Sequence, residues 1–240
     1  MMRDDAARAT TKGTAMNTLR IDFVSDISCP WCVIGLKSLE QALINIGEEA
    51  SVSIHFQPFE LNPQMAPEGE EIGAHLQRKY GASEEQSAQT RSMIAERGAQ
   101  LGFRFDLAQR SRIYNTFDAH RLLHWAELQE SAQADLLGVQ RALQLALFTA
   151  YFTHGLSPAS HEVLAQVAGE VGLEADEALE VLASGAYGDE VREREQFFQR
   201  AGINSVPAII INQRHLISGG QPPEVFEQAL RDIAAMPNAD

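Results

Sequence analysis

The sequence predicts an α/β fold that is interrupted by a large all-helical insertion. Apolar and polar residues alternate over 19–24 and again over 52–56, which is the period of a half-buried strand. Between these strands, residues 30–46 carry apolar side chains at helical spacing and end before a glycine. The chain therefore opens β–α–β, an order that favours two parallel strands joined by a right-handed crossover.

The C-terminal end predicts the rest of the same sheet. The β-branched run 208–211 suits a strand buried on both faces. Residues 212–214 predict a turn, after which 215–217 would return antiparallel. A last helix follows, with Pro222 and Pro223 in its first turn. Its expected buried stripe consists of Val225, Phe226, Ala229, Leu230 and Ile233.

The long middle of the chain has helical periodicity almost throughout. Residues 142–152 are apolar on nearly every side, which predicts the central helix of a bundle. The seven helices expected are 70–80, 83–101, 115–130, 132–153, 161–171, 175–184 and 188–201. We therefore expect a disordered leader over 1–17, a discontinuous sheet domain from 18–65 and 203–240, and a helical insertion over 66–202.

Composition and charge exclude several classes of protein. With 240 residues, of which 45% are hydrophobic, the chain is globular. A formal net charge of −14 argues against nucleic acid or an anionic membrane as a partner. The leader lacks the apolar segment of a secretory signal, and the run 142–153 is shorter than the roughly 20 residues that span a bilayer. The sequence predicts a cytoplasmic protein, and it leaves the oligomeric state open.

The only two cysteines lie in one tetrad, Cys29-Pro30-Trp31-Cys32, where the first strand gives way to the first helix. Proline suits the first helical position, which puts Cys29 at the N-cap. Free N–H groups and the helix dipole there favour a thiolate. Cys32, one turn deeper, could resolve a mixed disulfide. The tetrad predicts dithiol–disulfide exchange with Cys29 as the nucleophile, and Pro30 and the partly exposed Trp31 in contact with the substrate.

A CxxC pair is also half of a zinc site. His120 and His124 stand four residues apart on one predicted helix and could complete a Cys2His2 set. The alternative is then a zinc-stabilised binding module. Pro-Trp suits a helix start better than a metal knuckle, and the chain has no second CxxC, so we predict no metal.

A second motif, Val206-Pro207, precedes the buried strand 208–211. Proline has no backbone N–H to donate to a neighbouring strand, so it is unusual just before a buried strand. Its position there predicts a cis peptide bond in a tight turn. Beside the tetrad, the backbone of Val206 would face the sulfurs. A substrate backbone could add there as a short strand.

Together these motifs resemble the thioredoxin superfamily, and the long helical insertion resembles its DsbA branch. Finer strings resemble the FrnE-like proteins of that branch, relatives of the 2-hydroxychromene-2-carboxylate isomerases and the kappa-class glutathione transferases. These strings are Asp22-Phe23-Val24-Ser25-Asp26, Pro58-Phe59-Glu60-Leu61-Asn62-Pro63, Asn115-Thr116 with Ala119-His120-Arg121-Leu122, and Gly219-Gly220-Gln221-Pro222. The resemblance covers about residues 17–236 and implies a thioredoxin-like fold with a large all-α insertion.

The resemblance also implies further site residues. It places the helix of Asn115 and His120 over the tetrad, where His120 could hydrogen-bond the Cys29 thiolate or move its proton. The alternative makes Asn115 a helix N-cap and His120 an interface residue. By analogy with glutathione-binding relatives, a further set of residues before a helix N-terminus could hold a γ-glutamyl group. That set is Gly219, Gly220 and Gln221.

The buried carboxylate of thioredoxin and DsbA lies six residues before the nucleophilic cysteine, where this chain has Phe23. Asp26 is the candidate replacement, and a solvated or helix-capping loop aspartate is the alternative. Some FrnE-like proteins carry a second cysteine pair, which this chain lacks.

We therefore predict a thiol–disulfide oxidoreductase that requires no metal or organic cofactor. Its partners would be protein or small-molecule thiols and disulfides, with glutathione as a candidate redox partner or ligand. The enzymatic alternative is a glutathione-dependent isomerase or transferase, whose relatives typically have serine at the position of Cys29. Because the cysteine is present, redox exchange is the favoured interpretation.

Overall fold

The two ends of the chain build one four-stranded sheet in the order β2-β1-β5-β6. The computed structural model describes residues 18–66, 68–133 and 138–236. The predicted leader therefore lies outside the described residues. The strands are β1 (Thr18–Ser25), β2 (Ser51–Pro58), β5 (Ala208–Ile211) and β6 (His215–Ser218). β1 runs parallel to β2 and antiparallel to β5, and β6 returns antiparallel to β5. The predicted α/β topology is confirmed.

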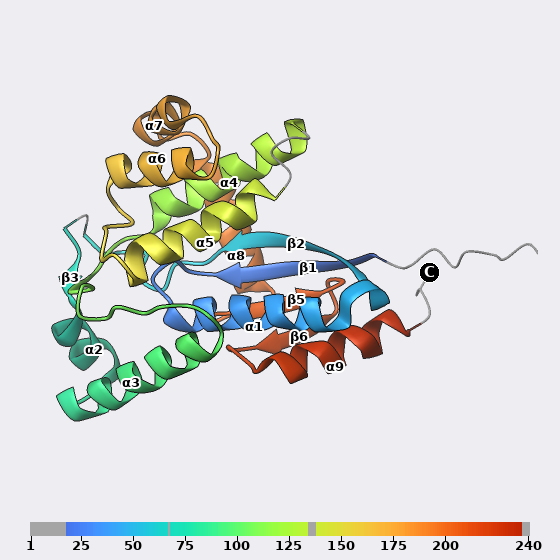
Figure 1. The fold of residues 1–240 in the computed structure, drawn as a ribbon. Helices are drawn as coiled ribbons and strands as arrows, with labels where there is room; N and C mark the ends of the chain where they lie inside the picture. Colours follow the sequence, from blue (N-terminus) through green and yellow to red (C-terminus); the bar gives the residue numbers. More distant parts are fainter. Residues whose placement is uncertain (1–17, 67, 134–137, 237–240) are drawn as a thin grey trace, which may run out of the picture.

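Helices cover both faces of this sheet (Figure 1). On one face, α1 (Pro30–Ile46) and α9 (Pro223–Ala234) lie side by side. On the other, α8 (Gly188–Arg200) packs against β2. The division into a sheet domain and an insertion stays a prediction, and α8 contacts the sheet although it lies within the predicted insertion.

The remaining helices lie at the end of the sheet where β1 finishes and α1 begins (Figure 1). They are α2 (Ile72–Tyr80), α3 (Glu84–Gln100), α4 (Phe117–Ala132), α5 (Val139–Phe152), α6 (His161–Glu170) and α7 (Ala175–Ser184). The helix predicted to be central corresponds to α5, which packs against α4, α6, α1 and β2. No helix of the described residues is long and apolar enough to cross a membrane.

Several expectations need correction. The helix predicted from residue 70 begins at Ile72, because Glu70–Glu71 form β3 and pair with β4 (Arg112–Ile113). The helix predicted over 132–153 begins at Val139 in the described part. Val225 is exposed, because the buried stripe of α9 repeats at Phe226, Leu230 and Ile233 and Val225 lies one residue off it. A single helical turn, Gly47–Glu49, follows α1.

Candidate functional site

The tetrad lies where β1 ends and α1 begins. Cys29 is the N-cap of α1, with extended backbone angles, and Pro30 stands in the first turn. The backbone N–H of Cys29 donates to the Asp26 carbonyl (3.1 Å), and that of Cys32 donates to the Cys29 carbonyl (3.1 Å). Both thiols are free. Cys29 is 4% exposed and Cys32 is fully buried, so Cys29 is the outer thiol.

The segment before β5 meets the outer sulfur. The Val206–Pro207 peptide bond is cis. The carbonyl of Val206 lies 3.6 Å from Cys29 Sγ, which donates to it. A Cβ at Gly35 would lie 2.9 Å from Pro207 Cγ, so only glycine in α1 leaves room for this approach. Two segments that are far apart in sequence thus meet at one sulfur.

The loop before α9 also reaches the tetrad. A Cβ at Gly220 would lie 3.0 Å from the Trp31 carbonyl, which shows how closely the loop lies against the first turn of α1. The Gly219 N–H donates to the Pro207 carbonyl (2.8 Å), and the Gln221 amide donates to the Ser218 carbonyl (2.8 Å). The predicted role of these residues in holding a γ-glutamyl group stays a prediction.

The two cysteines differ in their electrostatics. Burial raises the pKa of the Cys32 thiol well above its ordinary value, and the adjacent Cys29 raises it further. The Asp26 carboxylate adds a smaller upward contribution. Cys32 is therefore a protonated thiol near neutral pH, and it needs a base before it can attack a disulfide.

Asp26 is the acidic residue whose charge acts on this thiol. Its side chain is completely buried beneath the tetrad, where one oxygen accepts from the Ser28 N–H (2.9 Å) and the other from the Leu61 N–H (2.6 Å). The solvated alternative is wrong, although the carboxylate does cap the turn before α1. Phe23, at the position of the family's buried carboxylate, lies fully buried in β1.

His120 lies next to this carboxylate rather than on the sulfur. Its ring is 3% exposed, and Nε2 lies 3.2 Å from the Phe59 carbonyl and 4.0 Å from Asp26 Oδ1. No hydrogen bond to either cysteine is found among the described residues. Burial lowers the pKa of His120, against the upward pull of the Asp26 and Glu60 charges. The ring is therefore neutral at physiological pH.

Asn115 is not the N-cap of α4, because Thr116 occupies that position. Asn115 Oδ1 nonetheless accepts from the Phe117 N–H (2.9 Å) and so satisfies the first turn. This arrangement supports the structural interpretation of Asn115.

Sequence patterns did not predict the residues that α2 and α3 bring towards the tetrad. The Arg97 guanidinium lies over the partly buried Trp31 ring, 5.5 Å from its centroid. Tyr80, the last residue of α2, is 59% exposed; its partial burial raises its pKa, and the negative charges at Cys29 and Asp26 raise it further. Lys79 Nζ donates to the Leu61 carbonyl at 2.6 Å. No local motif marks these residues, because only the packing of a helical hairpin against α1 brings them close.

The geometry gives no support to the zinc alternative. Among the described residues, no group of three or more histidine, cysteine, aspartate or glutamate side chains could hold a metal ion. His120 faces Asp26 and Phe59, whereas His124 Nδ1 lies 3.8 Å from Glu127 Oε2.

The unequal thiols make a labelling prediction. Iodoacetamide at pH 7.5 should alkylate the reduced native protein once, at Cys29, because Cys32 is buried and its raised pKa keeps it protonated. Peptide mass mapping checks the site, and unfolded protein, in which both cysteines should react, is the control. Equal native labelling of Cys32 would contradict the assignment of inner and outer thiol.

Comparison with known proteins places this geometry in a family. The model of the DSBA-like thioredoxin domain matches residues 20–231. The structure is similar to that of a probable DsbA oxidoreductase from Streptomyces coelicolor, with a TM-score of 0.83 and 32% identity, covering 92% of this chain and 93% of that one.

More distant structures share the fold. A cytosolic disulfide reductase, DsbM from Pseudomonas aeruginosa with GSH, matches with a TM-score of 0.60 at 16% identity, covering 90% of this chain and 100% of that one. A 2-hydroxychromene-2-carboxylate isomerase matches with a TM-score of 0.64 at 14% identity, covering 89% and 95%. The family match and the cysteine pair at the helix start lead to one conclusion: the chain belongs to the DSBA-like thioredoxin domain family and is a redox enzyme.

Proposed function

We propose that this protein is a thiol–disulfide oxidoreductase in which Cys29 is the nucleophile and Cys32 the resolving thiol. The observation that carries the proposal is the placement of the pair. Cys29 is the outer thiol at the N-cap of α1, with a backbone carbonyl 3.6 Å from its sulfur, and Cys32 is buried one turn behind it. Partial positive charge at the helix start stabilises a thiolate there.

The exchange proceeds in two displacements. The Cys29 thiolate attacks one sulfur of a substrate disulfide, which breaks and releases one substrate thiolate. Cys32 then gives its proton to the Asp26 carboxylate and attacks Cys29 Sγ, releasing the second substrate thiolate. The substrate gains two electrons and the protein gains a Cys29–Cys32 disulfide. With no other cysteine in the chain, an external thiol must restore the reduced pair by the reverse sequence.

Substrate binding is proposed for the surface around Cys29. An extended substrate backbone would pair with the partly buried Val206, next to the cis bond to Pro207, and contact Pro30 and Trp31. The Val206 carbonyl already faces the outer sulfur, which supports this placement.

Glutathione is the small-molecule partner that we propose. The similar disulfide reductase DsbM was solved with GSH, and the loop of Gly219, Gly220 and Gln221 lies against Trp31 in this chain. We propose no metal or organic cofactor and a cytoplasmic location, where glutathione could regenerate the pair.

Trapping the intermediate tests this function. The Cys32→Ser variant should accumulate mixed disulfides through Cys29, because its second displacement is blocked. Incubation with oxidised glutathione followed by intact-mass spectrometry should show one glutathione per chain, removable by dithiothreitol. The Cys29→Ser/Cys32→Ser double variant, which has no thiol, should show none. Absence of an adduct on Cys32→Ser would overturn the proposed function.

A further inference from the structure

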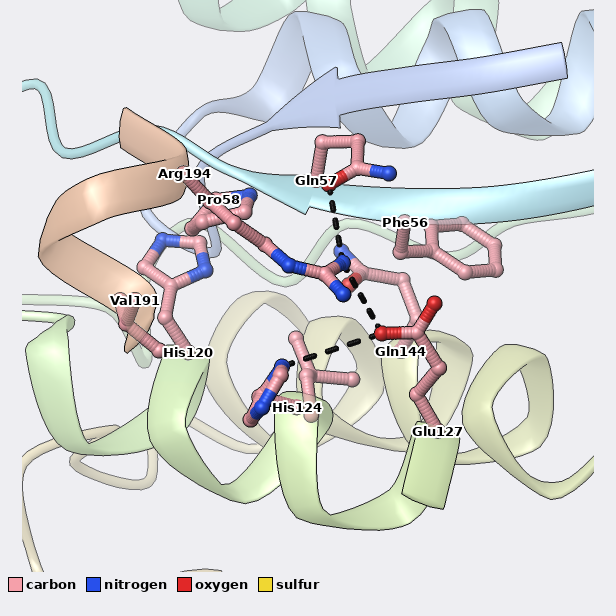
Figure 2. Close-up of a pocket in the computed structure, with 10 residues that line it drawn as sticks. Phe56, Gln57, Pro58, His120, His124, Glu127, Gln144, Val191 and Arg194 are labelled. Atoms are coloured by element: carbon pink, nitrogen blue, oxygen red, sulfur yellow. Dashed lines mark hydrogen bonds and ion pairs between the residues drawn. The ribbon is translucent and has the colours of Figure 1, made fainter. Parts of the chain in front are cut away.

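A small polar cavity lies between α4, α5, α8 and the end of β2 (Figure 2). Its volume of about 10 Å³ for the centre of a water molecule is room for about one water. The polar groups around it are Gln57, His120, His124, Glu127, Gln144 and Arg194.

Gln144 is the feature of this cavity that its packing does not explain. The side chain is completely buried, and neither its amide oxygen nor its amide nitrogen has a hydrogen-bond partner among the described residues. An unpaired buried amide destabilises a fold, so buried polar groups of this kind are usually satisfied by ordered water. His124 Nδ1, another buried atom at this cavity, also lacks a partner among these residues.

His120 links the cavity to the redox site. Its Nε2 lies 3.2 Å from the Phe59 carbonyl and 4.0 Å from Asp26 Oδ1, and the same ring lines the cavity. The two nitrogens of an imidazole point in different directions, so one ring can exchange protons on both sides. Figure 2 shows His120 at one end of the cavity and His124 farther along α4.

The far end of the cavity adjoins an open groove. His124, Gln57 and Arg194 line both the cavity and an open groove between α8 and the sheet. Arg194 Nη1 pairs with Glu127 Oε2 at 2.9 Å and lies 3.2 Å from Gln57 Oε1, so it forms part of the wall between the two spaces.

We propose that Gln144 holds one water molecule in this cavity, and that His120, this water and His124 conduct protons between Asp26 and solvent. The route rests on the proposed function, because it delivers a proton to Cys32 when the protein disulfide is reduced and removes that proton when the disulfide forms.

The hydrogen bond to Phe59 favours the neutral tautomer of His120 with its proton on Nε2. When the protein disulfide is reduced, Cys32 leaves as a thiolate. The ring of His120 shifts by about 1 Å into hydrogen-bond reach of Asp26. Its Nδ1 then takes a proton from the water, which is refilled through His124, as Nε2 gives its own proton to Asp26. Asp26 passes this proton to Cys32, and the ring stays neutral as its Nδ1–H tautomer. When Cys32 attacks a mixed disulfide, the same steps run in reverse.

The other charged groups that face His120 keep this ring available for both directions. Glu60 follows Phe59, and Arg192 on α8 is paired with both Glu60 and Glu195. The charges of Asp26 and Glu60 raise the pKa of His120. Burial and the charge of Arg192 lower this pKa, and the lowering is the larger effect. The neutral ring that results has one nitrogen to donate and one to accept.

The rate of the second displacement tests the route. Reduced protein is mixed with excess 2-hydroxyethyl disulfide, and the first-order limit of the tryptophan fluorescence change at saturating disulfide reports the attack by Cys32. Gln144→Leu, which puts an apolar side chain at the cavity, should lower this limiting rate at least about tenfold. The ratio of the limiting rate in H2O to that in D2O should be larger than for the wild type. The reduction potential against glutathione should not change, because a route does not alter an equilibrium.

Stability separates the route from a packing effect. Gln144→Leu should be about as stable as the wild type or more so, because it removes a buried amide that makes no hydrogen bond to another group of the described protein. The matched control is Gln140→Leu on the same helix, whose amide pairs with the Phe56 N–H and the Leu123 carbonyl. It should be less stable and keep the wild-type limiting rate.

A second variant, His124→Gln, keeps hydrogen-bonding groups but cannot pass a proton through its side chain, so it should be slowed like Gln144→Leu. Wild-type limiting rates in both Gln144→Leu and His124→Gln would overturn the route. Equal slowing in Gln140→Leu would also overturn it, since packing would then explain the effect. Failure of the proposed function is a different result, in which the wild type itself forms no Cys29–Cys32 disulfide.

Discussion

Replacing Cys29 with serine is expected to reduce disulfide exchange by a factor of about 1,000 or more, because a hydroxyl does not form the thiolate that attacks sulfur. The fold should survive, since serine is a good N-cap and the hydrogen bond from residue 29 to Asp26 uses only the backbone. Reduction of 2-hydroxyethyl disulfide by dithiothreitol measures the loss, and thermal denaturation of the same samples checks the fold.

The same variant separates the two enzymatic interpretations. A glutathione-dependent isomerase or transferase would keep its activity with serine at position 29 and would bind glutathione without oxidising it. Retention of exchange activity in Cys29→Ser, with Cys32 as the only thiol left, would contradict the assignment of Cys29 as the nucleophile.

Arg121→Met is expected to lower the free energy of unfolding by about 3–5 kcal/mol, the cost typical of breaking a buried charged network. The guanidinium is 3% exposed and ties α4 to the end of α7. It donates to the Ala186 carbonyl (2.7 Å), the Val181 carbonyl (2.5 Å) and Asp118 Oδ1 (2.6 Å). Carbonyls at a helix end have no hydrogen-bond partner within the helix. Removing the Arg121 guanidinium therefore leaves these carbonyls unpaired.

Urea denaturation of the reduced protein measures this change. The control is Arg104→Met, because the side chain of Arg104 is 78% exposed and its only ion pair is with Asp106 among the described residues. Its effect should stay within about 1 kcal/mol. An Arg121→Met variant as stable as the wild type would show that α4 and α7 are held by apolar packing alone.

Local patterns predicted most of the fold. The alternation over 19–24 and 52–56 was sufficient to predict β1 and β2. The helical spacing of apolar residues was sufficient to predict every helix from α1 to α9. Two-residue strands carry no period, so β3 and β4 escaped prediction and Glu70 was assigned to a helix. Val225 was misplaced for a related reason, because a stripe on a short helix is ambiguous by one residue.

The sequence by itself determined where the tetrad lies in the first turn of α1. A proline at the first helical position and a cysteine before it are enough to put Cys29 at the N-cap and Cys32 one turn behind, since both placements depend on a few adjacent residues. Only the tertiary structure decided what surrounds the sulfurs: the burial of Asp26, the Val206 carbonyl, Arg97 over Trp31, and the unpaired amide of Gln144. These contacts join segments far apart in the chain. Burial, which sets the protonation of Cys32 and His120, depends on such packing and has no local signal.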